Sequence, residues 1–233
     1  KKQFSTIFKD GNHHGAYAEY HDNKANSKKF EGAHSEGRRS GKWTEFYGSG
    51  GVLSVSNYVN GTLQGPAEYS YSSGNKKSTT VYKDGQHQGP YLEYYDNVDN
   101  SKSKEGRHAN NKKSGIWTEW HANKQVKSIE SYYEGALDGP AQYFYSSPGK
   151  KRAITVFKQG QHHGPYAEFF DNAANSKHFL GTHRENERFG QWTEWYSNGV
   201  EMWSQTYRDG KLHGSVTRFH DNGEVDFRTS YKY

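Results

Sequence analysis

Aromatic and polar residues alternate in short stretches along the whole chain. In Trp43-Thr44-Glu45-Phe46-Tyr47, the first, third and fifth side chains share one face of an extended strand, and the other two share the opposite face. Related stretches surround Trp117 and Trp192. Because both faces carry aromatic side chains, we expect each face to pack against a neighbouring unit or turn. The pattern predicts short β-strands, and helix signals are absent.

Glycines punctuate these strands at a regular spacing. The common skeleton of the units is aromatic-x-x-Gly-x-x-x-Gly, then a short strand, a turn and a second strand. Turn pairs such as Asn60-Gly61, Asp84-Gly85 and Asp209-Gly210 tolerate positive φ. At the start of a strand the missing N–H of proline is tolerable. Four prolines directly follow the second glycine of a unit: Pro66, Pro90, Pro140 and Pro165.

The units are grouped into a longer repeat. Phe8-Lys9-Asp10-Gly11 returns as Tyr82-Lys83-Asp84-Gly85 and again as Phe157-Lys158-Gln159-Gly160. This periodicity predicts nine hairpin units in three superrepeats of about 75 residues, within one continuous repeat domain. The expected divisions are an orphan second strand of an incomplete hairpin (1–7), superrepeat 1 (8–81), superrepeat 2 (82–156) and superrepeat 3 with a C-terminal cap (157–233).

The two ends of the chain differ from the repeat. The first residues align with the second strand of a unit, so we expect either upstream residues or another molecule to supply the missing partner strand. In the last unit Glu224-Val225 replaces a lysine pair, as expected of a capping repeat.

The skeleton, followed by an aromatic-x-Glu-aromatic strand and an Asn-Gly turn, resembles MORN repeats. The similarity is strongest to the bacterial MORN-variant, antitoxin-like repeat family, and it covers essentially the whole chain. It implies an all-β array of antiparallel hairpins. Because that family is defined by its hairpin, the resemblance implies scaffolding, membrane-proximal attachment or self-association and not a specific reaction.

Composition narrows the class of fold. Of the 233 residues, 30% are hydrophobic and 16% are aromatic, so Tyr, Phe and Trp supply most of the apolar surface. We therefore expect an elongated, single-layer β structure with a thin core. About 19 strands at about 4.8 Å each would extend on the order of 90 Å.

Cysteine is absent, which excludes disulfides and thiolate metal sites. Without cysteine and an initiator Met, the chain fits a secreted, periplasmic or cell-surface location best. No apolar run approaches the ~20 residues of a membrane-spanning helix, so we expect no transmembrane segment.

Basic residues recur in clusters, although the net charge is only +5. Stacked positive patches suit anionic lipid headgroups or glycans, whereas nucleic acid is a less favoured partner. Solvated residues that discourage sheet aggregation explain the clusters about as well. The candidate anion-binding residues are Lys28, Lys29, Arg38, Arg39, Lys76, Lys77, Lys112, Lys113, Lys150, Lys151 and Arg152.

Aromatic residues that repeat in register are the best candidates for a contact surface. Exposed Tyr and Trp can anchor a protein partner or stack on sugars, but the same residues would also fill a thin core. This candidate aromatic ladder comprises Trp43, Trp117, Trp192, Tyr17, Tyr91 and Tyr166.

Three further patterns have a structural explanation that we favour. Six glutamates stand four residues after a glycine, as Glu19 and Glu45 do, and we expect them to be hydrogen-bond acceptors or cross-strand partners of Lys and Arg. Histidines such as His13 and His162 are expected to pack in turns and not to bind metal. The loop 96–100 has some features of a calcium loop but lacks the bidentate Glu, which favours an ordinary turn.

The sequence therefore predicts a non-enzymatic binding or scaffolding protein without a cofactor, which contacts another protein or itself, including end to end. The alternative is a binder of anionic lipid or glycan through the basic patches and aromatic ladder. A weaker alternative, from the family label alone, is an antitoxin or immunity protein.

Overall fold

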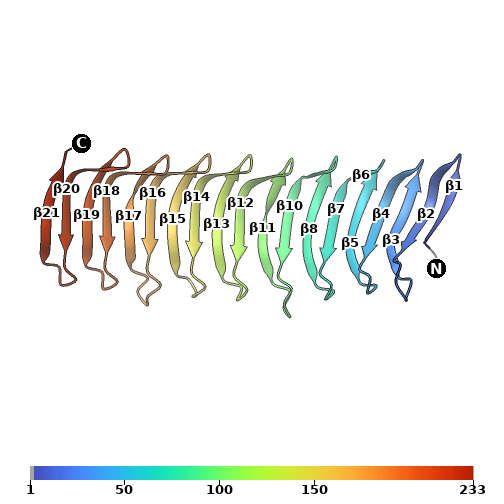
Figure 1. Ribbon diagram of the computed structural model, residues 1–233, viewed down its shortest axis with the longest axis horizontal. Helices are drawn as coiled ribbons and strands as arrows, with labels where there is room; N and C mark the ends of the chain where they lie inside the picture. The colour runs from blue at the N-terminus through green and yellow to red at the C-terminus, as the bar shows by residue number, and fades with distance from the viewer. Residues whose placement is uncertain (1–2, 233) are drawn as a thin grey trace. The chain divides into compact units, whose positions relative to one another are not determined.

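The computed structural model describes residues 3–232, which form 21 β-strands and no helix. The strands are joined as antiparallel hairpins of an open sheet, which confirms the predicted all-β fold. The chain divides into two compact units, Lys1–Lys112 and Lys113–Tyr233. Within each unit, consecutive hairpins lie side by side, with tight turns along one edge and longer turns along the other (Figure 1).

The first unit contains eleven strands and the start of a twelfth. They are β1 (Phe4–Lys9), β2 (Asn12–Tyr20), β3 (Lys28–Ser35), β4 (Arg38–Phe46), β5 (Val52–Val59), β6 (Thr62–Leu63), β7 (Gly65–Ser70), β8 (Lys76–Lys83), β9 (Gln86–His87), β10 (Gly89–Tyr94) and β11 (Lys102–Ala109).

The second unit contains the remaining strands. They are β12 (Lys112–Trp120), which starts at the last residue of the first unit, β13 (Val126–Tyr133), β14 (Ala136–Phe144), β15 (Lys151–Lys158), β16 (Gln161–Phe169), β17 (Lys177–Arg184), β18 (Glu187–Trp195), β19 (Glu201–Arg208), β20 (Lys211–Phe219) and β21 (Val225–Tyr231).

The strand count exceeds the predicted 19 because two long strands are interrupted. Strand β5 pairs with both β6 and β7, and β8 pairs with both β9 and β10. Counted as two continuous strands, these pieces restore the predicted number. The predicted orphan segment 1–7 includes residues 1 and 2, which lie outside the described residues, and its described part contributes to β1, which pairs with β2.

The two-residue turns have the backbone that their sequences predict. At Asn60-Gly61, for example, φ is +49° and +81°, as a type I′ turn requires. The second residue of each turn also links neighbouring hairpins. The N–H of Gly61 donates to the carbonyl of Arg39 at 2.9 Å, and that of Gly160 donates to Leu137 at 2.7 Å.

The second glycine of each hairpin forms a β-bulge. Gly139 has a φ of +106°, and the register between β13 and β14 shifts beside it. Glycine is the residue that adopts this conformation without strain. Because the bulge interrupts the ladder, Pro140 can follow it without an N–H group.

The opposite edge of each unit is stabilised by hydrogen bonds from one long turn to the next. The hydroxyl of Tyr71 donates to the carbonyl of Tyr94, and that of Tyr145 donates to Phe169, each at 2.8 Å. Within the longest turns an asparagine clamps the chain: Asn172 accepts from the N–H of Ser176 and donates to its Oγ.

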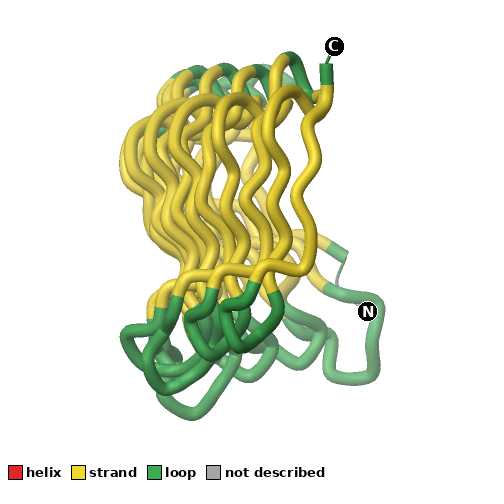
Figure 2. Tube along the Cα trace, turned by 90° about the vertical axis from the view of Figure 1, so that its left-hand side faces the viewer, coloured by secondary structure: helices red, strands yellow, loops and turns green. Residues whose placement is uncertain are grey.

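The two faces of the sheet differ. One face, which we call the Trp face, carries Trp43, Trp117 and Trp192, and these are among the most buried side chains. The other, the Pro face, carries Pro66, Pro90, Pro140 and Pro165, all exposed. Strands of the second unit, in front in Figure 2, bend instead of running flat. The core lies on the Trp face, in the thin layer of aromatic residues that the composition predicts.

Candidate functional site

The tryptophans of the predicted aromatic ladder are buried. Trp43, Trp117 and Trp192 are only 3%, 2% and 4% exposed. The indole N–H of Trp43 donates to the carbonyl of Ala33 at 3.0 Å, and that of Trp192 donates to Thr182 at 3.1 Å. Of the two interpretations of these residues, the structure therefore supports a core role, and they offer no contact surface to a partner.

A glycine on the neighbouring strand makes room for the indole of Trp43 and for that of Trp192. A Cβ atom added at Gly32 would collide with the ring of Trp43, and one added at Gly181 would collide with Trp192. Each indole thus packs directly over the backbone of a glycine on the adjacent strand. The register places Gly32 opposite Tyr17, whose ring also packs against Trp43 at a centroid distance of 5.5 Å.

The tyrosines of the ladder are half-buried and hydrogen-bonded. The hydroxyl of Tyr166 donates to Glu168 at 2.8 Å, and Tyr17 and Tyr91 donate in the same way to Glu19 and Glu93. Burial is the main cause that raises the pKa of Tyr166 to about 12, and the Glu168 carboxylate adds to it. Each tyrosine therefore keeps its proton and serves as a fixed donor.

The repeated glutamates have partners on adjacent strands. Lys29 lies 2.9 Å from Glu19, Lys127 lies 3.1 Å from Glu119, and His178 lies 3.7 Å from Glu194. These contacts match the expected acceptor and cross-strand roles. Equivalent glutamates of several hairpins therefore have a cation or a histidine on the next strand, which is the arrangement of a structural repeat.

The histidines form stacked pairs with aromatic neighbours. The Nδ1 atom of His162 shares a hydrogen bond of 2.9 Å with the Thr155 hydroxyl, and the tautomer of the ring decides which of the two donates. The centre of the His162 ring lies 4.4 Å from that of Phe157 and 5.1 Å from that of His183. Burial is the main cause that lowers the pKa of His183 to about 4, with His162 and Arg188 acting in the same direction. Among residues 3–232, no group of three or more His, Asp or Glu side chains is placed to hold a metal ion.

The loop 96–100 is held by protein contacts. Asp96 accepts from the Ser73 hydroxyl at 2.6 Å and from the Asn75 amide at 3.0 Å. Asn97 accepts from the backbone N–H of Ser101. This is the turn chemistry that the sequence favours over a calcium site.

Most of the candidate anion-binding residues have partners within the chain. Four lie within 4 Å of a carboxylate: Lys28 (2.8 Å from Glu31), Lys29 (2.9 Å from Glu19), Lys76 (3.8 Å from Glu68) and Lys150 (3.3 Å from Asp171). Four lie over aromatic rings: Arg39, Lys77, Lys113 and Arg152. Arg38 and Lys112 are exposed and Lys151 is half-buried. Eight of these eleven side chains therefore have a carboxylate or an aromatic ring of the same chain as a neighbour.

A row of side chains on the Trp face of the second unit contains two concave sites. Directly opposed residues on successive strands share a face. They give the row Glu119, Ser128, Tyr143, Ala153, Glu168, Phe179, Glu194, Trp203, Arg218 and Phe227.

Every second residue of this row, starting from Ser128, is either a ring or a small side chain, and the surface is hollow where it is small. Phe179, Trp203 and Phe227 fill their places with rings, whereas Ser128 and Ala153 do not. A hollow of about 330 Å³ lies at Ala153, and another of about 220 Å³ lies at Ser128. The sequence shows that these two residues are small, but only the register shows that they belong to an aromatic row.

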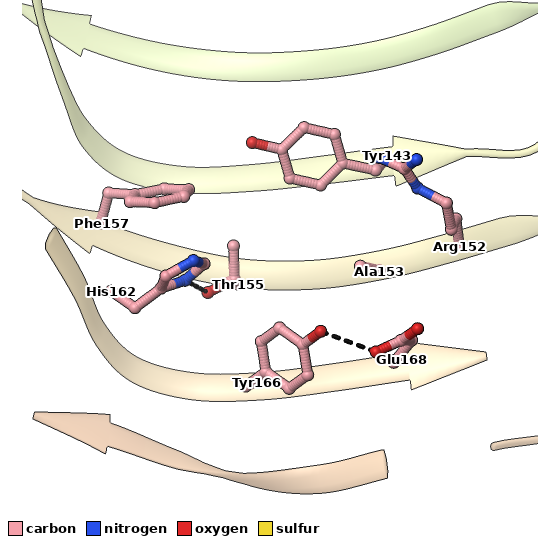
Figure 3. Close-up of a pocket in the computed structure, with 8 residues that line it drawn as sticks. All are labelled: Tyr143, Arg152, Ala153, Thr155, Phe157, His162, Tyr166 and Glu168. Carbon is pink, nitrogen blue, oxygen red and sulfur yellow. Dashed lines mark hydrogen bonds between the residues drawn. The ribbon is translucent and has the colours of Figure 1, made fainter. Parts of the chain in front are cut away.

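Rings and charged groups surround the larger hollow (Figure 3). Tyr143 borders it on β14, and Tyr166 with Glu168 borders it on β16, while Ala153 and Thr155 lie between them. The guanidinium of Arg152 lies 5.4 Å from the centre of the Tyr143 ring. Tyr143 and Arg152 line the smaller hollow as well, so they separate the two.

Three segments match the family described as MORN repeat variant: residues 39–60, 113–133 and 212–233. The chain contains MORN repeats. Each match begins in the second strand of one hairpin, crosses a five-residue turn and covers the following strand, in β4–β5, β12–β13 and β20–β21. The resemblance noted in the sequence is thus confirmed, and in these MORN repeats the buried Trp43 and Trp117 belong to matched segments.

Comparison with curated proteins finds no match. Among solved structures, the chain is similar to one chain of the crystal structure of TcdB2–TccC3–Cdc42, with 10% sequence identity and a TM-score of 0.20. The similarity covers 97% of this chain but only 15% of the other. A likeness this weak supports no conclusion about function. The described residues include no helix that is long and apolar enough to cross a membrane.

Proposed function

We propose that this MORN-repeat protein is a non-enzymatic scaffold that contacts proteins through its Pro face. The observation that supports this most is the exposure of large apolar side chains on that face. In the second unit, Ile116 is 66% exposed, Tyr133 is 68% exposed and Leu180 is 41% exposed. Surfaces of this kind gain free energy when a partner removes them from water.

The surroundings of these side chains fit a protein partner. Ile116 is paired with Ser131, whose hydroxyl donates to the carbonyl of Pro140, and Pro140 is paired with Val156. The result is a strip of small, uncharged and proline side chains across β12 to β15. Depletion of charge around aromatic and aliphatic residues is typical of the centre of a protein interface.

A catalytic role has less support. The carboxylates of the Trp face repeat in equivalent surroundings from hairpin to hairpin, each with a Tyr, Lys or His neighbour. Binding of a polyanion through the basic clusters also ranks lower, because intramolecular carboxylates and rings occupy most of those side chains. The antitoxin alternative rests on the family label alone.

Charged substitutions on the Pro face test the proposal. The variant Ile116→Asp/Tyr133→Asp/Leu180→Asp adds three charges to the Pro face of the second unit. A matched control, Val98→Asp/Ala173→Asp/Ala174→Asp, adds three charges at exposed long turns. The wild type and both variants serve as baits for affinity capture. Each captured protein is then purified, and its affinity for the three baits is measured by titration. Analytical sedimentation measures the self-association of the three proteins.

We expect the control to bind as the wild type does and the Pro-face variant to lose at least about tenfold in affinity, equivalent to about 1.4 kcal/mol. Equal affinity of all three proteins for every partner, including a second copy of the chain, contradicts the proposal.

A further inference from the structure

We infer that the two hollows on the Trp face of the second unit form a binding site for a neutral, linear oligosaccharide. This inference is independent of the Pro-face contact, because the hollows lie on the opposite face of the same strands. It rests on the aromatic rings, the charges of both signs and the fully paired main chain around Ala153 and Ser128.

Aromatic rings supply the platforms that a sugar ring needs. Tyr143 stands between the hollows and lines both, and Tyr166 and Phe157 border the larger one. The C–H faces of a pyranose ring pack on such rings, while its hydroxyls remain free to reach polar groups at the rim. The burial that raises the pKa of Tyr143 and Tyr166 keeps both as neutral phenols.

Charged groups of both signs surround the hollows, and Arg152 is shared, so two cations face three carboxylates. Arg152 and Glu168 line the larger hollow, whereas Lys127, Arg152, Glu119 and Glu130 line the smaller one. Sugar hydroxyls both donate and accept, so they can bind a guanidinium and a carboxylate at once. A polyanion would bring its charge against the carboxylates, which favours a neutral saccharide.

Peptides are a poorer fit to the same site. An extended peptide binds a sheet mainly through free main-chain groups at an edge strand. Here β14, β15 and β16 are each paired on both sides, so their main-chain groups are occupied by the ladder. Any ligand must be held by side chains alone.

The spacing of the hollows indicates an oligomer and not a single sugar. Ser128 and Ala153 lie two strands apart on the row, which corresponds to about 10 Å. Tyr143 stands between them and is the shared platform. A chain of hexoses that crosses the strands would reach both hollows at once.

The equivalent position in the first unit differs from the larger hollow by one hydrogen bond between side chains. Tyr69, Ser78 and Tyr82 occupy the positions that Tyr143, Ala153 and Phe157 occupy one superrepeat later. The hydroxyls of Tyr69 and Tyr82 share a hydrogen bond of 3.0 Å. Phe157 has no hydroxyl, so no equivalent hydrogen bond joins it to Tyr143 across the site.

Isothermal titration with neutral hexasaccharides tests the site. The probes are α-linked and β-linked glucose hexamers and a β-linked N-acetylglucosamine hexamer, with a heparin-derived hexasaccharide as the anionic comparison. The variant Ala153→Phe restores the ring that Phe179 and Trp203 supply further along the row. Ala173→Phe, at an exposed turn, makes the same substitution away from the site, and Arg152→Ala removes an exposed cation without filling the hollow.

We expect saturable binding of at least one neutral hexamer that does not depend on salt concentration. Both Ala153→Phe and Arg152→Ala should weaken it at least about tenfold, while Ala173→Phe leaves it unchanged. Circular dichroism establishes that each variant is folded.

Three results overturn the inference. These are the absence of binding by every neutral hexamer, salt-dependent binding of the heparin fragment alone, and neutral binding that folded Ala153→Phe leaves intact. None of them bears on the Pro face, so the two proposals fail separately.

Discussion

The phenolic oxygens of Tyr69 and Tyr82 lie 3.0 Å apart and share a hydrogen bond on the Trp face of the first unit. Tyr82 is only 9% exposed, so its hydroxyl depends on this partner. We expect Tyr82→Phe to lower the free energy of unfolding by about 1 kcal/mol, because the bond is lost and Tyr69 keeps a half-buried hydroxyl. Urea denaturation measures the change. Tyr133→Phe is the control, since Tyr133 is 68% exposed, and an equal loss in the two variants would contradict this account.

The fit between Gly32 and Trp43 leaves no room for a methyl group. We expect Gly32→Ala to destabilise the protein by about 1–3 kcal/mol, because the indole must leave its place in the core. Thermal unfolding followed by Trp fluorescence reports both the lower Tm and the altered surroundings of the indole. Gly48→Ala is the matched control: the nearest atom to its added methyl group would be 3.9 Å away, in the Asn23 side chain. A wild-type Tm for Gly32→Ala would show that the pair is not tightly packed.

The buried, stacked histidines should make the free energy of unfolding depend on pH. His183 has a pKa of about 4 in the folded protein against an ordinary value of 6.5. Above pH 6.5 it is neutral in both states. Between pH 6.5 and 4 the unfolded chain takes up a proton that the folded protein excludes, so stability falls through this window and the contribution is constant below it.

We therefore expect His183→Phe to make the free energy of unfolding fall less steeply between pH 6.5 and 4. His34→Phe should act in the same direction, because burial also lowers the pKa of His34. Urea denaturation at a series of pH values measures the slope. An unchanged slope in both variants would be evidence against buried histidines as the source of acid sensitivity.

The hydroxyl of Tyr145 links two long turns through the carbonyl of Phe169, at 2.8 Å. We expect Tyr145→Phe to cost about 1 kcal/mol and to act locally, because only the edge contact is removed. Amide hydrogen exchange should accelerate in the turn 170–176, while the strands near Trp192 stay protected. Acceleration spread evenly over the second unit would instead indicate a global loss of stability.

Local chemistry made the fold predictable from sequence. The two residues of each tight turn, the second of them Gly or Asn, adopt positive φ. The next glycine allows a bulge, and the alternation of side chains sets the strands between the turns. The aromatic composition correctly indicated that rings, not aliphatic side chains, fill the core.

Cross-strand relationships could not be predicted in the same way. Trp43 was open to two interpretations, because burial depends on Gly32 lying beneath the indole on the neighbouring strand. The hollow at Ala153 is defined by a register across several strands, and no local pattern around Ala153 distinguishes it from any other small residue. The partners of Lys29 and Arg152 likewise depend on which residues the ladder places opposite them.

The hydrogen bonds between successive turns also control how the length of the chain can change. The carbonyl that Tyr145 binds lies 24 residues ahead, and the one that Asn175 binds lies 24 residues behind. Adding or removing a whole hairpin still leaves a hydroxyl such as that of Tyr145 opposite a carbonyl at the end of the next hairpin, as in the links of Tyr47 and Tyr71. A single inserted residue within a strand would shift those groups out of alignment and reverse the two faces beyond it. Growth and shortening of this protein are therefore restricted to complete hairpins, and engineered versions of different lengths should be built in those steps.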